Sequence, residues 1–300
     1  MDVYNRGDAG RLLTLQSKKS SVLLALCERE GEIYVVLTRR ASKMRKHAGQ
    51  VAFPGGKNED TDVNDYNCAI REAYEEMRFP SLNEAPLEHL SKGKQVRYVL
   101  TNEVVDVLDF HIEPTPPHYV TIRMPDGREK QTTTERLTVK GVEFVCEMER
   151  LAQPNFTPPM VVTPVVVKMD YEAVYSQLVP NEDECNAVFL APLSMFLKES
   201  TEHSVFELKH KTGTYRMHHF NVKGDGGGDG RGDEGDGEGG DGGEVFDVWG
   251  MTADVIIRVA SVVYQQRPQF SLNASEDHLY PKSHDFVHIQ KSTTNPSSKM

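Results

Sequence analysis

The sequence predicts an α/β fold in which strand-like segments alternate with two amphipathic helices. Two apolar runs, 22–27 and 33–37, flank a polar turn at Gly31 and indicate a β-hairpin. From about Val63 to Arg78 the apolar side chains recur at helical spacing. The segment VFDVWGMTADVIIRVASVVYQQ, which begins at residue 245, indicates a strand followed by the second helix.

The remaining elements are predicted in chain order after Pro80, which would end the first helix. Residues 80–160 contain strand-like pieces separated by proline-rich turns. PMVVTPVVVKMD, which begins at Pro159, indicates a buried strand. NAVFLAPLSMFL, which begins at Asn186, indicates a strand and a short helix, and HSVFELKHKTGTYRMHHFNV, which begins at His203, indicates another hairpin.

The composition allows one large domain or two small ones and gives no sign of a nucleic-acid-binding protein. The chain has 300 residues, 38% of them apolar, and a net charge of -11. Eight acids and one Arg between Asp225 and Glu244 contribute -7, so the other 280 residues carry only -4. No broad basic field is expected.

Cysteine spacing and hydropathy exclude several further classes. The cysteines are Cys27, Cys68, Cys146 and Cys185. They form no C-x-x-C pair, and we expect free thiols in a reducing compartment. The first twenty residues lack the apolar core of a secretory signal, and no apolar run is long enough to predict a membrane span.

The tract GDGGGDGRGDEGDGEGGDGG, at 224–243, predicts a disordered loop. Twelve of its twenty residues are Gly and none is apolar, so it cannot bury enough surface to offset its ordering entropy. It lacks the Gly-Lys-Ser/Thr ending of a phosphate-binding loop, and its acids would repel phosphate. We therefore interpret it as a linker.

Three glutamates on the first helix carry the chemistry. Glu72, Glu75 and Glu76 lie within an arc of about 100° at helical geometry. Like charges at this spacing destabilise a helix, and a solvated acidic face is the simplest interpretation of such a pattern alone. A bound Mg²⁺ or Mn²⁺ would offset the repulsion between the three carboxylates, because both ions take carboxylate oxygens as ligands. Both also bridge to substrate phosphates, so a metal site is the alternative interpretation.

The segment from Gly55 to Phe79 resembles the Nudix box, G-x5-E-x7-R-E-U-x-E-E-x-G-U, in which U is a bulky aliphatic residue. It differs at three places. Asp62 stands for the first Glu, one extra residue separates Asp62 from Arg71, and Arg78 stands for the closing Gly. The R-E-x-x-E-E core, which carries the metal chemistry of the family, is intact.

The resemblance implies a Nudix α/β/α sandwich with a mixed β-sheet and assigns roles to single residues. Arg71 and Asp62 would brace the loop against the helix. The implied reaction is attack of water on a diphosphate linked to another moiety, with Mg²⁺ or Mn²⁺ as cofactor. The predicted metal ligands are the carbonyl of Gly56 and the carboxylates of Glu72, Glu75 and Glu76.

The stretch LTRRASKMRKHAGQVAFPGG, which begins at residue 37, places five Lys or Arg residues and a His directly before the box. It resembles the motif L-T-x-R-S-x-x-L-R-x-H-x-G-Q-V-x-F-P-G-G of the coenzyme A diphosphatase branch, with Ala41 and Met44 replacing Ser and Leu. The 3′-phosphate of coenzyme A would explain a basic loop; a solvated loop is the alternative. The predicted substrate-binding residues are Arg39, Arg40, Arg45, His47 and Gln50.

The resemblance continues in blocks from about residue 22 to residue 267, interrupted by two insertions, at about 80–155 and in the Gly/Asp-rich tract. Glu184 aligns with an acid of the branch and is the predicted general base, with Glu72 as the alternative. A general base must reach the attacking water, so an exposed loop carboxylate is the competing interpretation of Glu184.

Two aromatic features are open to more than one interpretation. Trp249, the only Trp, lies between a strand and a helix and is expected in the core rather than as a base-stacking platform. His218 and His219 are neighbours in a predicted strand, so at most one of them would face a substrate.

The chain ends in Ser298, Lys299 and Met300, which resembles the S-K-L type of peroxisomal signal. We therefore expect a peroxisome or peroxisome-like organelle and an import receptor that binds the C-terminus, with the cytoplasm as the alternative. The expected layout is one catalytic domain over 20–268, followed by a flexible tail over 269–300.

The expected function is metal-dependent hydrolysis of the diphosphate of coenzyme A or its acyl esters, giving 3′,5′-ADP and a 4′-phosphopantetheine species. One alternative is a Nudix hydrolase of another nucleoside diphosphate derivative, such as ADP-ribose, a dinucleotide or an RNA cap. The other alternative is a binding protein that keeps the fold without turnover. The intact R-E-x-x-E-E core favours an enzyme.

Overall fold

The computed structural model describes most of the chain. The described ranges are 18–44, 47–99, 101–153, 160–210, 213–224 and 244–272. Arg45, residues 225–243 of the predicted Gly/Asp-rich loop, and residues 273–300 with the C-terminal tripeptide lie outside these ranges.

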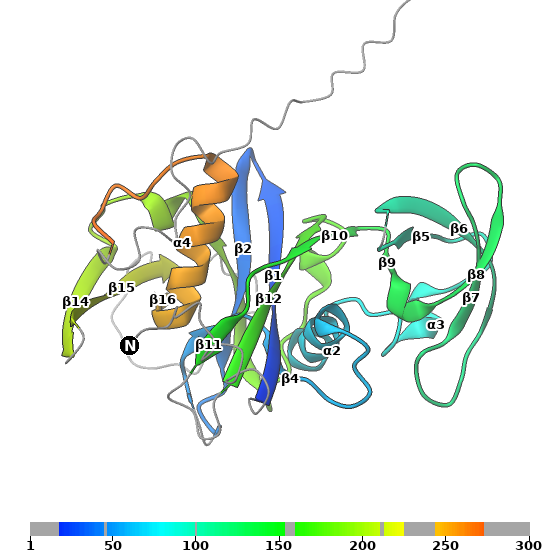
Figure 1. Cartoon of the computed structure of the whole chain (residues 1–300), viewed down its shortest axis with the longest axis horizontal. Coiled ribbons are helices and arrows are strands. Elements are labelled where there is room, and N and C mark those ends of the chain that lie inside the picture. Colours follow the sequence, from blue (N-terminus) through cyan, green and yellow to red (C-terminus); the bar gives the residue numbers. More distant parts are fainter. Residues whose placement is uncertain are drawn as a thin grey trace, which may run out of the picture.

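A mixed sheet of eight strands forms the centre of the fold (Figure 1). The strands are β1 (Lys18–Arg29), β2 (Glu32–Arg40), β3 (Val51–Ala52), β4 (Gly55–Lys57), β10 (Val142–Glu147), β11 (Leu151–Gln153), β12 (Met160–Met169) and β13 (Cys185–Pro192). The order is β10-β12-β1-β2-β13, with β11, β3 and β4 paired to β12, β2 and β1. β1 and β12 are parallel, whereas the other pairs are antiparallel.

The side chains of β1 alternate between two cores, because successive strand residues face opposite sides of a sheet. Val22 and Leu24 pack with residues of helix α4 (Gly250–Tyr264), and Leu23 and Ala25 pack with residues of helix α2 (Asp65–Met77). Figure 1 shows the two helices on opposite sides of the central sheet. The predicted α/β/α sandwich with a mixed sheet is therefore confirmed.

Residues 95–139 of the predicted insertion form a second, antiparallel sheet with a core of its own. Its elements are β5 (Gln95–Tyr98), β6 (Glu103–His111), β7 (Tyr119–Arg123), β8 (Glu129–Thr133) and β9 (Leu137–Val139), with helix α3 (Pro86–His89) before them and the 3₁₀ helix η1 (Thr134–Arg136) among them. Figure 1 shows this sheet beyond α2, away from the central sheet. The following strands, β10 and β11, return to the central sheet, so the last part of the 80–155 segment pairs there.

A third sheet covers the α4 side of the molecule. It consists of β14 (His203–His210), β15 (Gly213–Lys223) and β16 (Val245–Trp249), in that order. Phe220 and Val222 of β15 and Phe246 and Val248 of β16 join the core that contains α4. Two 3₁₀ helices precede this sheet in the chain, η2 (Tyr175–Gln177) and η3 (Leu193–Leu197). No helix within the described ranges is long and apolar enough to cross a membrane.

All four cysteines are thiols, as their spacing predicted. Cys27, Cys68 and Cys185 are buried, and Cys146 is exposed. Burial raises the pKa of Cys68 and of Cys185 to about 12, so both remain protonated at neutral pH. Both thiols therefore serve as small, mostly apolar groups in the core, because only the deprotonated thiolate is a nucleophile.

Candidate active site

Helix α2, which carries the three glutamates, begins at a side-chain cap and ends in a left-handed turn. Asn64 Oδ1 accepts a hydrogen bond from the backbone N–H of Asn67 at 2.8 Å. Arg78 caps the other end with φ 57° and ψ 33°. Gly adopts this left-handed conformation more easily than other residues, which explains why the resembled motif has Gly at this position. In this chain the backbone of Arg78 is strained there instead.

Arg71 fastens the loop before α2 to the helix. Its Nε lies 3.0 Å from Asp62 Oδ1, and its Nη2 lies 3.0 Å from Asp62 Oδ2, so the contact is a fork. Nη2 also donates to the carbonyl of Lys57 at 3.0 Å. The Asp62 side chain is 3% exposed and that of Arg71 is 11% exposed, so water screens this pair very little.

Gly56 leaves room for the carboxylate of Glu72. A Cβ atom at Gly56 would overlap the carboxylate atoms of Glu72, so any larger residue would displace that side chain. The Gly56 carbonyl accepts a hydrogen bond from Ser20 Oγ. Gly55 is equally constrained, because a Cβ there would lie 2.7 Å from the Cα of Val22. The Gly-Gly turn therefore brings backbone carbonyl and carboxylate oxygens together.

Each of the three glutamates lies beside an arginine. Arg71 Nη2 is 3.2 Å from Glu72 Oε1, and Arg71 Nη1 is 3.1 Å from Glu75 Oε1. Arg40 Nη1, from β2, is 3.6 Å from Glu76 Oε1. The predicted substrate-binding Arg40 and the predicted metal ligand Glu76 thus meet in the structure.

Burial and mutual repulsion favour the protonated forms of two of these acids. Burial raises the pKa of Glu72 to about 7, with repulsion from Glu75 and Glu184 adding to the rise and Arg71 opposing it. Burial likewise raises the pKa of Glu76 to about 8, with Glu72 and Glu184 adding to the rise and Arg40 opposing it. A cation among these carboxylates would stabilise their charged forms.

The donor atoms suit a hard divalent cation, although the side chains are not gathered around one point. Among the described residues, no three His, Cys, Asp or Glu side chains converge closely enough to hold a metal ion as placed. The Glu72 carboxylate nevertheless lies against Gly56, and Glu76 is buried beside it in charge contact. Carboxylate and carbonyl oxygens are the ligands that Mg²⁺ and Mn²⁺ prefer.

Glu184 lies on a turn that is hydrogen-bonded to the end of α2. The Glu184 backbone N–H donates to the carbonyl of Asn181 at 2.8 Å, and the Asn181 N–H donates to the carbonyl of Glu76 at 2.8 Å. The charge of Glu184 contributes to the raised pKa values of Glu72 and Glu76. The structure therefore brings the predicted general base to the acidic helix.

The basic loop is attached to the same turn. The N–H of Ala41 donates to the carbonyl of Glu184 at 2.9 Å, and Lys43 Nζ lies 2.5 Å from Asp183 Oδ1. His47 Nδ1 and Gln50 Oε1 are 2.8 Å apart. Thus the predicted substrate-binding residues His47 and Gln50 contact each other at the end of this loop, while Arg45 lies outside the described residues.

Arg39 is separated from the other predicted site residues. Its Nε donates to Asn186 Oδ1 at 2.7 Å, its Nη1 contacts Glu244, and its guanidinium lies over the ring of Phe246. Phe246 belongs to the core that contains α4, whereas Arg40 contacts Glu76 on the α2 side. The strand period of two sends the adjacent arginines to opposite faces of the sheet.

Several residues of the site were not singled out from the sequence. Thr38 Oγ1 contacts Glu76 Oε2 at 3.4 Å, and its place two residues before Arg40 was the available signal. Asp65 accepts hydrogen bonds from Asn58 Nδ2 at 3.0 Å and Thr163 Oγ1 at 2.9 Å, and so anchors the start of α2. Asn181 was not singled out either, because its partners on α2 are far away in sequence.

The aromatic candidates lie in the third sheet. His218 is buried and contacts His203, with 3.0 Å between ring nitrogens. Trp249 is partly buried and stacks on His219, with 5.6 Å between ring centroids. The structure therefore pairs each of these rings with another ring of the same sheet.

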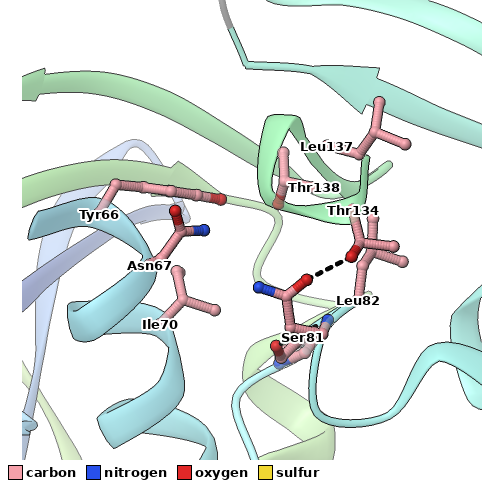
Figure 2. Close-up of a pocket in the computed structure, with 10 residues that line it drawn as sticks. Tyr66, Asn67, Ile70, Ser81, Leu82, Thr134, Leu137 and Thr138 are labelled. Carbon is pink, nitrogen blue, oxygen red and sulfur yellow. Dashed lines mark hydrogen bonds between the residues drawn. The ribbon is translucent and has the colours of Figure 1, made fainter. Parts of the chain in front are cut away.

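A small cavity lies on the other side of α2 (Figure 2). The helix residues that line it are Tyr66, Asn67 and Ile70, which at about 100° per residue lie opposite Glu72. Its other wall comes from the segment after α2 and from η1 and β9, where Figure 2 shows Thr134, Leu137 and Thr138. This cavity lies between the helix and the inserted segment and is not part of the acidic site.

Comparisons with known proteins find similarity to Nudix proteins. The family described as the NUDIX domain matches residues 17–161, which include β1 to β4, α2 and the inserted sheet. Nudix hydrolase 15, mitochondrial, of Arabidopsis thaliana is 28% identical over 267 residues, covering 88% of this chain and 65% of the relative.

Two further relatives differ in how much of each chain they match. The peroxisomal coenzyme A diphosphatase NUDT7 of Mus musculus is 26% identical over 277 residues, covering 92% of this chain and 84% of the relative. A protein named Uncharacterized Nudix hydrolase NudL, of Enterobacter sp. (strain 638), is 48% identical over 66 residues, covering 22% of this chain and 34% of the relative. The chain thus spans less than two thirds of the Arabidopsis and Enterobacter relatives.

Proposed function

We propose that the chain is a metal-dependent Nudix hydrolase that cleaves the diphosphate of coenzyme A or its acyl esters, a proposal supported by the match of the NUDIX domain family to residues 17–161. The observation that carries this proposal is the contact between an acidic helix and a basic loop. Arg40 meets Glu76, and the turn that bears Glu184 is hydrogen-bonded to both the helix and the basic loop. Such a site has carboxylates for cations and, beside them, cationic groups for phosphates.

The proposed ligands of Mg²⁺ or Mn²⁺ are the Gly56 carbonyl and the carboxylates of Glu72, Glu75 and Glu76. When bound, the ion would supply a Lewis acid that neutralises negative charge on phosphate oxygens. Arg71 positions Glu72 and Glu75 through its contacts with them and with Asp62.

Glu184 is the proposed general base, with Glu72 as the alternative. The base takes a proton from the attacking water while a new oxygen–phosphorus bond forms. The bond between that phosphorus and the bridging oxygen breaks, and the other phosphate leaves with the bonding electrons. The products from coenzyme A are 3′,5′-ADP and 4′-phosphopantetheine.

Recognition of coenzyme A is supported by the motif of the basic loop and by one relative. The loop matches the motif of the coenzyme A diphosphatase branch at Arg40, Arg45, His47 and Gln50. The mouse relative is named a coenzyme A diphosphatase. The 3′-phosphate of the substrate would bind to the side chains of this stretch, of which Arg40 is held beside the acids and His47 lies against Gln50.

A side-by-side kinetic comparison tests the substrate. We expect kcat/KM for coenzyme A to exceed that for dephospho-coenzyme A by at least about tenfold, because one charge-assisted phosphate contact is lost. ADP-ribose, NADH and capped RNA serve as competitors. Preference for one of these would contradict the coenzyme A assignment and leave the hydrolase assignment in place.

The peroxisomal location stays a prediction. The relatives described above are named peroxisomal in one case and mitochondrial in another. A fluorescent fusion that leaves Met300 free, compared with the same fusion carrying Lys299→Glu, would test the tripeptide. Peroxisomal fluorescence that persists in the variant would contradict the prediction that the tripeptide is a targeting signal.

A further inference from the structure

The last turn of α2 is capped by a segment that lies more than 100 residues further along the chain. Asn181 Nδ2 donates to the carbonyl of Glu75 at 3.1 Å, and the Asn181 N–H donates to the carbonyl of Glu76 at 2.8 Å. The N–H of Val179 donates to the carbonyl of Met77 at 3.0 Å. These carbonyls have no partner within a helix, so the segment supplies what the helix end requires.

Asn181 also shapes the turn that carries Glu184. Its side-chain Oδ1 accepts from the N–H of Asp183 at 3.2 Å, and its carbonyl accepts from the N–H of Glu184 and of Cys185, each at 2.8 Å. Cys185 Sγ donates back to the carbonyl of Glu76 at 3.0 Å. Both ends of the turn, Asn181 and Cys185, are therefore hydrogen-bonded to the acidic helix. Asn181 is also hydrogen-bonded to the residues that follow it in the turn.

We propose that Asn181 is a positioning residue that holds the Glu184 carboxylate at a fixed place relative to Glu72 and Glu76. This inference rests on the proposed hydrolase function, in which Glu184 takes the proton of the attacking water. Asn181 does not itself touch the reacting atoms. It acts through the turn.

Only an amide serves both contacts of this side chain. Its N–H₂ donates to the Glu75 carbonyl while its oxygen accepts from Asp183. An Asp of the same shape would keep the acceptor and lose the donor. It would also place a negative charge at the carboxyl end of a helix, close to Glu75, where negative charge is unfavourable.

The same turn extends to the basic loop through the hydrogen bond from Ala41 to the Glu184 carbonyl. A shift of the turn would therefore move the basic loop as well as Glu184. A loss confined to kcat would place the effect at the base, and a rise in KM would place it at the substrate-binding loop. We expect the kcat effect to dominate, because one side-chain contact of Asn181 is with helix α2, the other is within the turn that carries Glu184, and neither is with the basic loop.

The test is a double-mutant cycle of Asn181→Ala, Asn181→Asp and Glu184→Gln, assayed with whichever diphosphate substrate the wild type hydrolyses best. We expect each Asn181 variant alone to lower kcat by about 10- to 100-fold, as for other supporting contacts around a site. In the Glu184→Gln background the same changes should lower kcat by less than about twofold. Gln177→Ala is the matched control, because its amide also donates to a backbone carbonyl, that of Ala173, away from the site.

Losses that multiply in the double variants would overturn the proposal, as would an Asn181→Asp variant that folds and is fully active. The substrate panel keeps this result separate from the coenzyme A assignment, because the cycle is read on any substrate that is turned over. Amide hydrogen exchange at Ala41 gives a readout that does not depend on activity. Faster exchange there in Asn181→Asp, with α2 still protected, supports the proposal; unchanged exchange overturns it.

Discussion

The buried pair between Asp62 and Arg71 predicts a large and specific loss of stability. Arg71→Met would leave Asp62, whose side chain is 3% exposed, without its forked partner. Removing one partner of a buried ion pair costs about 3–5 kcal/mol, because the remaining charge is desolvated and unpaired. Asp62→Asn should cost less, since Arg71 keeps its contacts with Lys57, Glu72 and Glu75.

The double variant gives the sharpest form of this prediction. Each single variant lowers the free energy of unfolding. The double variant, Asp62→Asn with Arg71→Met, should lower it by at least about 1 kcal/mol less than the two single variants do when their losses are added. Urea unfolding followed by the fluorescence of the single Trp249 measures all three free energies of unfolding. Arg128→Met is the control, since its pair with Asp126 is exposed and its loss should leave the midpoint unchanged. Additive losses, or an Arg71→Met midpoint equal to that of the control, would refute the reasoning.

Three further predictions concern stability, pH and the two adjacent arginines. Arg78→Gly should raise the free energy of unfolding by about 0.5–1 kcal/mol, because Gly adopts the left-handed cap without a Cβ clash; an unchanged urea midpoint would count against it. Burial, and then the charge of His203, lower the pKa of His218 to about 4, so only the unfolded chain gains a proton there as pH falls from about 6.5 to 4. Stability should therefore fall by up to about 3 kcal/mol across that window, and urea titrations should show a flatter pH dependence in His218→Gln. Arg40→Gln should lower kcat/KM by at least about tenfold and Arg39→Gln by less than about twofold, and equal losses would contradict the opposite orientation of the two side chains.

Local patterns account for the parts of the fold that the sequence predicts well. The apolar stripe of α2 gives a helix at Asp65–Met77, close to the predicted limits. The hairpin, the strand PMVVTPVVVKMD and the strand before α4 also appear where their apolar residues placed them. In each case the apolar side chains that define the pattern face a core, so the sequence pattern reflects the packing.

Contacts between distant segments account for what the sequence does not reveal. β1 pairs in parallel with β12, more than 140 residues away, and no local signal specifies that partner. The core of the inserted sheet is likewise built from strands whose order cannot be read from single apolar runs. Asn181 lies in a polar stretch of ordinary composition, and only the fold brings it to the carbonyls of α2.

The arrangement of the arginines could have been predicted in part. Arg39 and Arg40 are the last two residues of β2, and the strand period of two requires them to face opposite ways. Arg40 was predicted to bind substrate because it matches the resembled motif, and Arg39 because it lies in the same basic cluster. Their different partners, Glu244 for Arg39 and Glu76 for Arg40, appear only once the strand is packed between two cores.

The most direct test of the central claim is product analysis after incubation of coenzyme A with the full chain and Mg²⁺ or Mn²⁺. The account predicts equal amounts of 3′,5′-ADP and 4′-phosphopantetheine, lost on chelation of the metal and reduced about 100-fold or more in Glu76→Gln. Glu172→Gln, a change of the same kind at an exposed position, should leave the yield unchanged. Intact coenzyme A after incubation with folded wild-type protein, or equal yields from wild type and Glu76→Gln, would contradict it.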